Sequence, residues 1–192
     1  MEAASASADH PVPYASDMRE RPNGVGTAAA VLIAITDRAS NKGNGPGVIL
    51  TQRPETMRRH AGQVAFPGGR IDPEDIDAID AALREAEEEV ALPRGQVEII
   101  QALSAYQTIT EFDIIPVLAV IPPDLPLVPH DREVAAVFEV PLSFIFDPAN
   151  RREQSVMVAG IERRYFEILW GERRIWGATA EMLANLSARL KW

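Results

Sequence analysis

The feature that most constrains this chain is a pair of glycines followed by an acidic, amphipathic stretch. Gly68 and Gly69 come first, and the stretch after them carries three glutamates at i, i+3 and i+4: Glu85, Glu88 and Glu89. This spacing places the carboxylates on one surface of an α-helix. The other surface is apolar and suited to packing on a core, with the residues Ile79, Ala82, Leu83, Ala86 and Val90. The pattern predicts a helix over about residues 77–90, limited by Pro93.

Three carboxylates crowded on a packed helix indicate a cation site. Like charges at this spacing cost about 0.2–0.5 kcal/mol per pair, so their grouping needs a compensating positive charge. Mg²⁺ prefers oxygen ligands and commonly shares its coordination with substrate phosphates. The alternative is an ordinary solvated helix face whose glutamates pair with Arg84. The glycines upstream favour the first interpretation, which is metal-assisted phosphate chemistry.

This segment resembles the Nudix box of the Nudix hydrolases, a glycine followed at a set distance by Arg-Glu-hydrophobic-x-Glu-Glu-x-Gly-hydrophobic. The residues that fall on the pattern are Arg84, Glu85, Ala86, Glu88, Glu89 and Leu92. Ala91 stands at the usual glycine, so the helix must end without a residue that readily adopts positive φ. The spacing from Gly69 to Arg84 is one residue longer than in the commonest box. Either Asp75 or Asp77 can therefore be its first acidic position.

A second motif resembles the coenzyme A pyrophosphatase branch of the Nudix family. It consists of residues 50–54, with the sequence Leu-Thr-Gln-Arg-Pro, and then Arg58, Gly62, Phe66, Pro67, Gly68 and Gly69. Pro54 stands where that branch usually has a serine. The similarity continues through residues 138–142, 147–150 and 175–180, so it covers about residues 28–190.

The resemblance implies hydrolysis of the pyrophosphate bond of coenzyme A or its thioesters, with Mg²⁺ or Mn²⁺ as the cofactor. The products would be 3′,5′-ADP and 4′-phosphopantetheine or its acyl form. The alternatives are a Nudix pyrophosphatase for ADP-ribose, dinucleotides or nucleoside triphosphates, and a catalytically silent Nudix module that binds a ligand. A structural α/β protein with a solvated acidic helix is a further alternative. The intact set of glutamates argues against a silent module.

The resemblance also implies roles for individual residues. Glu85 and Glu89 are the expected main metal ligands, with Glu88 as a third and the backbone carbonyl of Gly69 as a further one. Arg84 stands four residues before Glu88 and is expected to orient its carboxylate. The general base stays open among three glutamates, namely Glu88, Glu133 and Glu111.

Substrate recognition would fall to arginines and glycines upstream of the helix. The nearest basic cluster, suited to the 3′-phosphate of coenzyme A, consists of Arg53, Arg58 and Arg59. Gly68 and Gly69 let the backbone approach a phosphate closely. The aromatic residues available to stack on adenine, if they do not belong to the core, are Phe66, Tyr106 and Phe112.

Composition excludes several other classes of protein. The 192 residues include no cysteine, which rules out disulfides and thiolate metal sites, and the three histidines have no ligand-like spacing. A net charge of −9 disfavours nonspecific nucleic-acid and anionic-membrane binding. No apolar run approaches the roughly 18–20 residues of a membrane span, and the start lacks a secretory signal. We therefore expect a cytoplasmic protein with a small-molecule substrate.

The hydrophobic pattern predicts one domain over residues 27–192, preceded by a loose arm over residues 1–26. Expected strands cover residues 27–36, 47–51, 64–66, 97–106, 114–121 and 134–140, followed by a hairpin of 164–170 and 172–175. A closing helix over 179–190 should present Met182, Leu183, Leu186 and Leu190 to the core. These elements favour a three-layer α/β/α sandwich. The Nudix resemblance implies the same architecture with a mixed central sheet, and it suggests a homodimer.

Overall fold

The computed structural model describes residues 26–39, 45–57, 60–108, 112–158 and 161–190. Its main sheet is built around two ten-residue strands, β1 (Thr27–Thr36) and β7 (Phe112–Ile121). They pair in parallel from Thr27 opposite Phe112 to Thr36 opposite Ile121. Every other pairing in this sheet is antiparallel, so the sheet is mixed, as expected.

The remaining strands extend the main sheet on both sides of this pair. The path runs β3-β2-β1-β7-β5, while β4 pairs with β1, β6 with β7 and β8 with β2. Their bounds are β2 Gly47–Gln52, β3 Val64–Ala65, β4 Gly68–Arg70, β5 Glu98–Ala102, β6 Tyr106–Gln107 and β8 Ala136–Pro141. The first two predicted strands are neighbours, because Ile35 pairs with Val48 across an antiparallel β1–β2 ladder.

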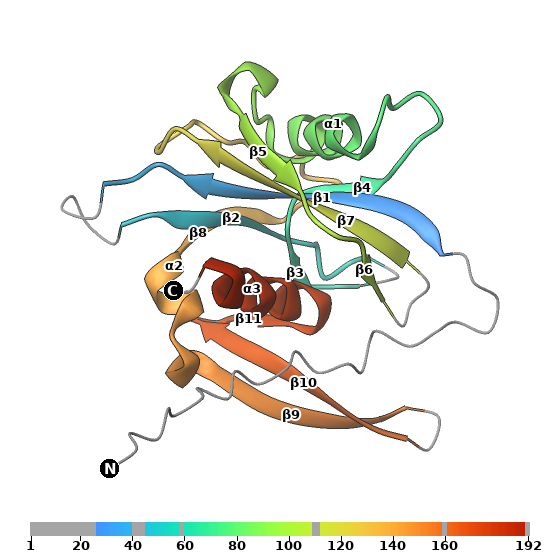
Figure 1. Ribbon diagram of the computed structural model, residues 1–192, viewed down its shortest axis with the longest axis vertical. Coiled ribbons are helices and arrows are strands. Elements are labelled where there is room, and N and C mark those ends of the chain that lie inside the picture. The colour runs from blue at the N-terminus through green and yellow to red at the C-terminus, as the bar shows by residue number, and fades with distance from the viewer. Residues whose placement is uncertain (1–25, 40–44, 58–59, 109–111, 159–160, 191–192) are drawn as a thin grey trace, which may run out of the picture.

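Helices cover the two faces of this sheet. Helix α1 (Ala78–Val90) lies on one face and helix α3 (Gly177–Leu190) on the other (Figure 1). A separate three-stranded sheet packs on the far side of α3. Its strands are β9 Arg151–Val158, β10 Ile161–Trp170 and β11 Arg173–Trp176. Three short helices complete the described fold: α2 Leu142–Phe146, η1 Arg94–Gln96 and η2 Pro148–Asn150. The α/β/α layering is confirmed, and the second sheet adds a layer.

The core divides into two clusters, one on each face of the main sheet. The cluster under α1 is rich in alanine, because Ala81, Ala82 and Ala86 are completely buried. Small side chains let the helix approach the sheet closely, which fixes the height of its glutamates above β1 and β4. The other cluster joins α3 to both sheets. No helix in the described part of the chain is long and apolar enough to cross a membrane.

Several predicted elements need correction. The expected strand over residues 97–106 is divided into β5 and β6, and Gly68 and Gly69, which were not included in any expected strand, belong to strand β4. Strand β9 was not predicted, since its run of charged residues shows no apolar alternation. Leu190 is 50% exposed and does not join the core. The closing helix begins two residues earlier than predicted, at Gly177.

Candidate functional site

The ends of α1 are fixed by two different caps. Asp77 Oδ1 accepts hydrogen bonds from the backbone N–H groups of Ile79 (2.8 Å) and Asp80 (2.9 Å), which makes Asp77 the N-cap. At the other end Ala91 has φ 54° in the left-handed region, and its N–H donates to the carbonyl of Glu87. The helix therefore ends with a residue in the left-handed conformation, which glycine supplies in many other helices. For alanine this conformation costs about 1–2 kcal/mol.

Arg84 ties the turn after β4 to the acidic helix. Its Nε and Nη2 donate to the two carboxylate oxygens of Asp75 at 2.9 and 3.1 Å. Its Nη1 donates to both Glu85 and Glu88 at 3.1 Å, and its Nη2 also donates to the carbonyl of Arg70. The predicted contact with Glu88 is therefore confirmed, but Asp75 is the bidentate partner. Between the two candidates for the first acidic position, Asp75 faces Arg84 while Asp77 caps the helix.

Glu89 is the buried carboxylate of the site. The residue is 5% exposed, and its Oε2 accepts a hydrogen bond from the backbone N–H of Gly68 at 3.2 Å. Burial raises the pKa of Glu89 to about 7. The charges of Glu85 and Glu133 raise it further, whereas the Gly68 N–H and the charge of Arg53 oppose the rise. Four residues from different parts of the chain thus act on the Glu89 carboxyl group, in addition to its burial.

Glu85 lies beside Glu89 at the junction of β4 and α1. Burial raises the pKa of Glu85, and the adjacent Arg84 guanidinium opposes that rise. A Cβ atom added to Gly69 would overlap the Glu85 carboxylate, so a glycine leaves room for this side chain. Gly68 has φ 154°, and a Cβ atom there would overlap the backbone of β1 at Ala30. A role for either glycine in contacting phosphate stays a prediction.

The segment between β7 and β8, residues 122–135, brings Glu133 to this site. The N–H groups of Val128 and His130 donate to the carbonyls of Val90 and Glu89 at 3.0 and 2.8 Å. These bonds satisfy carbonyls that an α-helix leaves without partners at its C-terminus. Glu133 is exposed, and its charge contributes to raising the pKa of both Glu85 and Glu89.

Arg53 approaches the acidic residues from the end of β2. Its N–H donates to the carbonyl of Gln63 at 2.9 Å, and its charge lowers the pKa of Glu89. The Nε atom of Arg53 is buried without a hydrogen-bond partner. A buried donor of this kind is costly unless a ligand supplies an acceptor. The other predicted site residues on loops, Arg58, Arg59 and Glu111, lie outside the described residues.

The aromatic residues proposed for stacking are mostly core residues. Phe66 is 2% exposed and Tyr106 is 8% exposed. The Tyr106 hydroxyl donates to Glu181 Oε2 at 2.5 Å, so its ring is held within the protein. Phe112 is half-buried, with the guanidinium of Arg70 5.9 Å from its ring centre. The core alternative is therefore confirmed for Phe66 and Tyr106.

The described residues do not form a ready-made metal cage. Among them, no three acidic or histidine side chains converge closely enough to hold a metal ion by themselves. The side chain of Glu88 is 59% exposed and directed to Arg84, whereas Glu85 and Glu89 lie next to Gly68 and Gly69. This donor set still suits a hard divalent cation, because it is all oxygen and includes a buried carboxylate that a positive charge would stabilise. Waters and substrate phosphates would have to complete the coordination.

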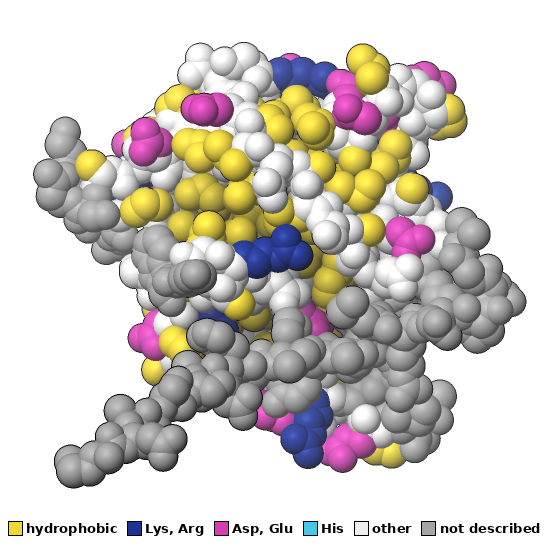
Figure 2. All heavy atoms as spheres, in the orientation of Figure 1, with side chains coloured by type: hydrophobic (Ala, Val, Ile, Leu, Met, Phe, Trp, Pro, Cys, Tyr) yellow, Lys and Arg dark blue, Asp and Glu magenta, His cyan; other side chains and the backbone are white. Residues whose placement is uncertain are grey.

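Two hollows lie away from these acidic residues. One of about 270 Å³ lies on the α3 face, lined mainly by apolar side chains that include Ile33, Met182 and Leu186. Figure 2 shows hydrophobic side chains gathered on this side of the molecule, below the charged side chains around α1. The other, of about 250 Å³, lies beneath residues 122–127. Neither hollow is lined by Glu85 or Glu89.

The sequence matches the family model described as the NUDIX domain over residues 26–162. It is 42% identical over 162 residues to the uncharacterized Nudix hydrolase NudL of Escherichia coli K12, covering 84% of this chain and 82% of that relative. The corresponding protein of Shigella boydii serotype 4 is 41% identical with the same coverage.

Solved structures show the same fold at lower sequence identity. The Nudix hydrolase RenU from M. smegmatis has a TM-score of 0.53 and 24% identity, covering 66% of this chain and 80% of that one. A MutT protein from Methanosarcina mazei Go1 has a TM-score of 0.54 and 16% identity, covering 86% and 94%. At these identities the likeness concerns the fold alone.

Proposed function

Because the chain belongs to the Nudix family, whose hydrolases generally use divalent metal ions, we propose that it hydrolyses coenzyme A or its thioesters at the pyrophosphate bond. Water adds to one phosphorus atom, and the bond from that phosphorus to the bridging oxygen breaks. The products are 3′,5′-ADP and 4′-phosphopantetheine or its acyl form. The oxygen of the water enters the phosphate that was attacked, the bridging oxygen stays with the other phosphate, and the two protons of the water go to the product phosphates or to solvent.

The observation that carries the proposal is the meeting of the two sequence motifs at Glu89. The coenzyme A motif begins on β2 and ends on β4, and its halves are joined where Gln52 pairs with Val64. It thereby brings Arg53 and Gly68 to the buried carboxylate of Glu89. Arg53 is a cation whose buried Nε lacks a hydrogen-bond partner, and it lies near Glu89, a carboxylate suited to binding a metal ion. This arrangement fits a substrate with two linked phosphates.

We assign roles according to these contacts. Glu85, Glu89 and the Gly69 carbonyl hold the metal ion, with Glu88 as a further ligand. The ion supplies charge neutralisation at the phosphates and lowers the pKa of a water molecule. Arg84 holds Asp75, Glu85 and Glu88 in place. Arg53 binds a substrate phosphate, together with Arg58 and Arg59.

Glu133 is our choice for the general base. Its carboxylate is exposed and acts on Glu85 and Glu89, whereas the competing Glu88 carboxylate already accepts a hydrogen bond from Arg84. A base must be free to accept a proton from the attacking water. Glu133→Gln should therefore lower kcat more than Glu88→Gln does.

The test is hydrolysis of coenzyme A by the purified chain with Mg²⁺ or Mn²⁺, with the products identified by mass. We expect 3′,5′-ADP, no turnover in EDTA, and a loss of at least about a hundredfold in Glu89→Gln. Glu87→Gln is the matched control, because Glu87 lies on the same helix but its carboxylate pairs with Arg94.

Other outcomes would point to other substrates or to no reaction. Cleavage of ADP-ribose, a dinucleotide or a nucleoside triphosphate without cleavage of coenzyme A would support pyrophosphate hydrolysis and refute coenzyme A as the substrate. If none of these compounds is turned over with either metal, the proposed hydrolase activity would be refuted and a ligand-binding module favoured.

A further inference from the structure

An arginine just beyond β1 joins two distant segments of the chain. Arg38 donates to both carboxylate oxygens of Asp124 at 3.2 and 2.8 Å. It also donates to both oxygens of Glu139 on β8, from Nε at 3.4 Å and from Nη2 at 3.0 Å. Thr36 donates a further hydrogen bond to Glu139 at 2.7 Å. We name Arg38, Asp124 and Glu139 the Arg38 clamp.

The clamp is more than an exposed ion pair. The side chains of Arg38 and Glu139 are only 23% and 27% exposed, and Glu139 is also held by Thr36. The side chain of Asp124 is 76% exposed, but its carboxylate accepts two hydrogen bonds from one guanidinium, and these bonds lower the pKa of Asp124. Bidentate pairs of this kind fix geometry as well as charge.

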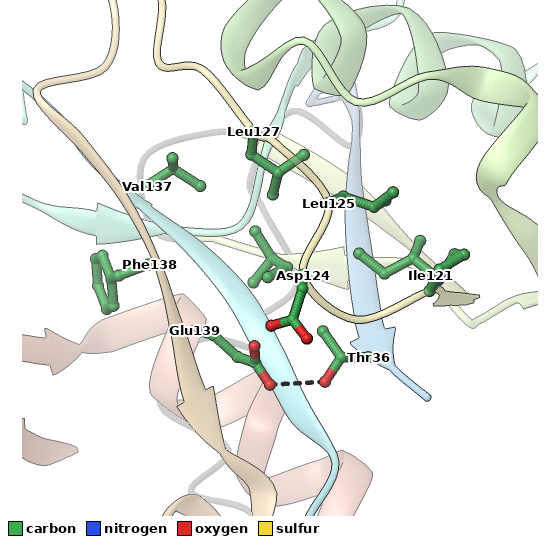
Figure 3. A pocket seen from close by; sticks show the side chains of 10 residues that line it. Thr36, Ile121, Asp124, Leu125, Leu127, Val137, Phe138 and Glu139 are labelled. Atoms are coloured by element: carbon green, nitrogen blue, oxygen red, sulfur yellow. Dashed lines mark hydrogen bonds between the residues drawn. The ribbon is translucent and has the colours of Figure 1, made fainter. Parts of the chain in front are cut away.

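The clamp stands at one end of the hollow beneath residues 122–127. Figure 3 shows Asp124 and Glu139 turned toward the same end of this pocket, with Leu125, Leu127 and Val137 along its walls. Leu125 and Leu127 are partly buried and pack against the core cluster under α1, but a hollow of about 250 Å³ remains beside them. The polar contacts of the clamp therefore add to an incomplete packing of this part of the segment.

The same segment carries Glu133 at its other end. Between the clamp and Glu133, Val128 and His130 are bonded to the last turn of α1. After Glu133, the buried Val134 and the bond from the Ala135 N–H to the Gln52 carbonyl (2.8 Å) fix the return to β8. The clamp is thus the first of several contacts that together set the position of the segment and of Glu133 within it.

We propose that Arg38 is a positioning residue for the reaction, acting through Asp124 on the segment that presents Glu133 to Glu85 and Glu89. This inference rests on the proposed function, in which Glu133 is the general base. In this role Arg38 contacts neither the metal ion nor the substrate. Loosening the clamp lets the segment shift relative to α1, and small shifts of a base have large effects on rate.

The test compares Arg38→Met with Asp124→Asn, which leaves Arg38 and Glu139 paired and keeps a residue type that tolerates the φ of 60° at this position. For both variants we expect kcat to fall about threefold to tenfold, while KM stays within about twofold of the wild-type value. Amide hydrogen exchange should become faster at Val128, His130 and Ala135. Arg38→Lys keeps the charge and should restore part of kcat.

The decisive arm repeats Arg38→Met in a Glu133→Gln background. If Arg38 acts through Glu133, the second substitution should cause little further loss of kcat. The matched control is Arg94→Met, which removes an arginine that also bridges two carboxylates, but those of Asp80 and Glu87, which are both on α1 and not on the segment. It should leave kcat and the exchange of the segment unchanged.

Three results would overturn the positioning role in an active protein. They are unchanged exchange in the segment, an unchanged kcat in Arg38→Met, or an equal loss of kcat in the Glu133→Gln background. A wild-type chain that turns over none of the candidate substrates would instead refute the proposed function, and the positioning role with it.

Discussion

Replacing Glu89 with glutamine should stabilise the metal-free protein at neutral and higher pH while removing its activity. Glu89 is almost fully buried, and its pKa rises from an ordinary 4.5 to about 7. At about 1.36 kcal/mol per pKa unit, this rise corresponds to about 3 kcal/mol. Glutamine keeps an acceptor for the Gly68 N–H but carries no charge, so it avoids the cost of ionising a buried group.

The sign follows from linkage between folding and protonation. The folded pKa of Glu89 lies above the unfolded one, so the stabilising contribution of its protonated form is complete below about pH 4.5. It is lost as pH rises through about 7. The wild-type chain should therefore lose about 3 kcal/mol relative to Glu89→Gln between about pH 4.5 and about pH 8.

The assay is denaturant unfolding of both proteins in EDTA at the two pH values, with the difference in unfolding free energy taken at each. Comparing the two chains cancels titrations that they share. Saturating Mg²⁺ at the higher pH should raise the stability of the wild type and not of the variant, because only a folded site with Glu89 binds the ion. A difference that does not change with pH would refute the buried-charge argument.

Two substitutions at glycine and alanine positions test other parts of the site. Ala91→Gly should raise the stability by about 0.5–1 kcal/mol, since glycine adopts φ 54° without strain, and thermal unfolding would show an increase of about 2 °C. A lower midpoint would contradict the left-handed cap. Gly69→Ala should leave the fold nearly as stable but displace the Glu85 carboxylate, so metal-dependent turnover should fall. Gly68→Ala should instead unfold the chain, because the new methyl group meets the β1 backbone, which does not move aside. Thermal unfolding and Mg²⁺ titration would separate these two outcomes, and equal effects of the two variants would count against the distinction.

The acidic helix could be predicted from the sequence because local rules specify it. Its apolar face repeats with the helical period, Asp77 supplies a capping side chain at the first turn, and Pro93 limits the end. Those signals act over a few residues, and the structure agrees with them to within one residue at the start. The two long central strands also follow from their apolar runs, whereas their parallel pairing does not.

The parts that sequence did not show depend on contacts between distant segments. Nothing in the spacing of Asp75 and Arg84 reveals their bidentate pair, since nine positions match no regular period. The position of Glu133 depends on main-chain hydrogen bonds from Val128 and His130, and backbone groups carry no sequence signal. The split between β5 and β6 is likewise set by pairing with β7, not by composition.

Gly68 and Gly69 are required by the packing of the folded chain, independently of any contact with substrate. Their sequence context suggested a backbone that approaches phosphate closely. In the folded chain each glycine already has a requirement of its own: Gly68 lies against the backbone of β1 at Ala30, and Gly69 leaves space for the carboxylate of Glu85. The same close contact lets the Gly68 N–H reach Glu89. Strand β4 therefore places Glu85 and Glu89 before any substrate binds, and a substitution at Gly69 should act on the metal ligands even where phosphate contacts are absent.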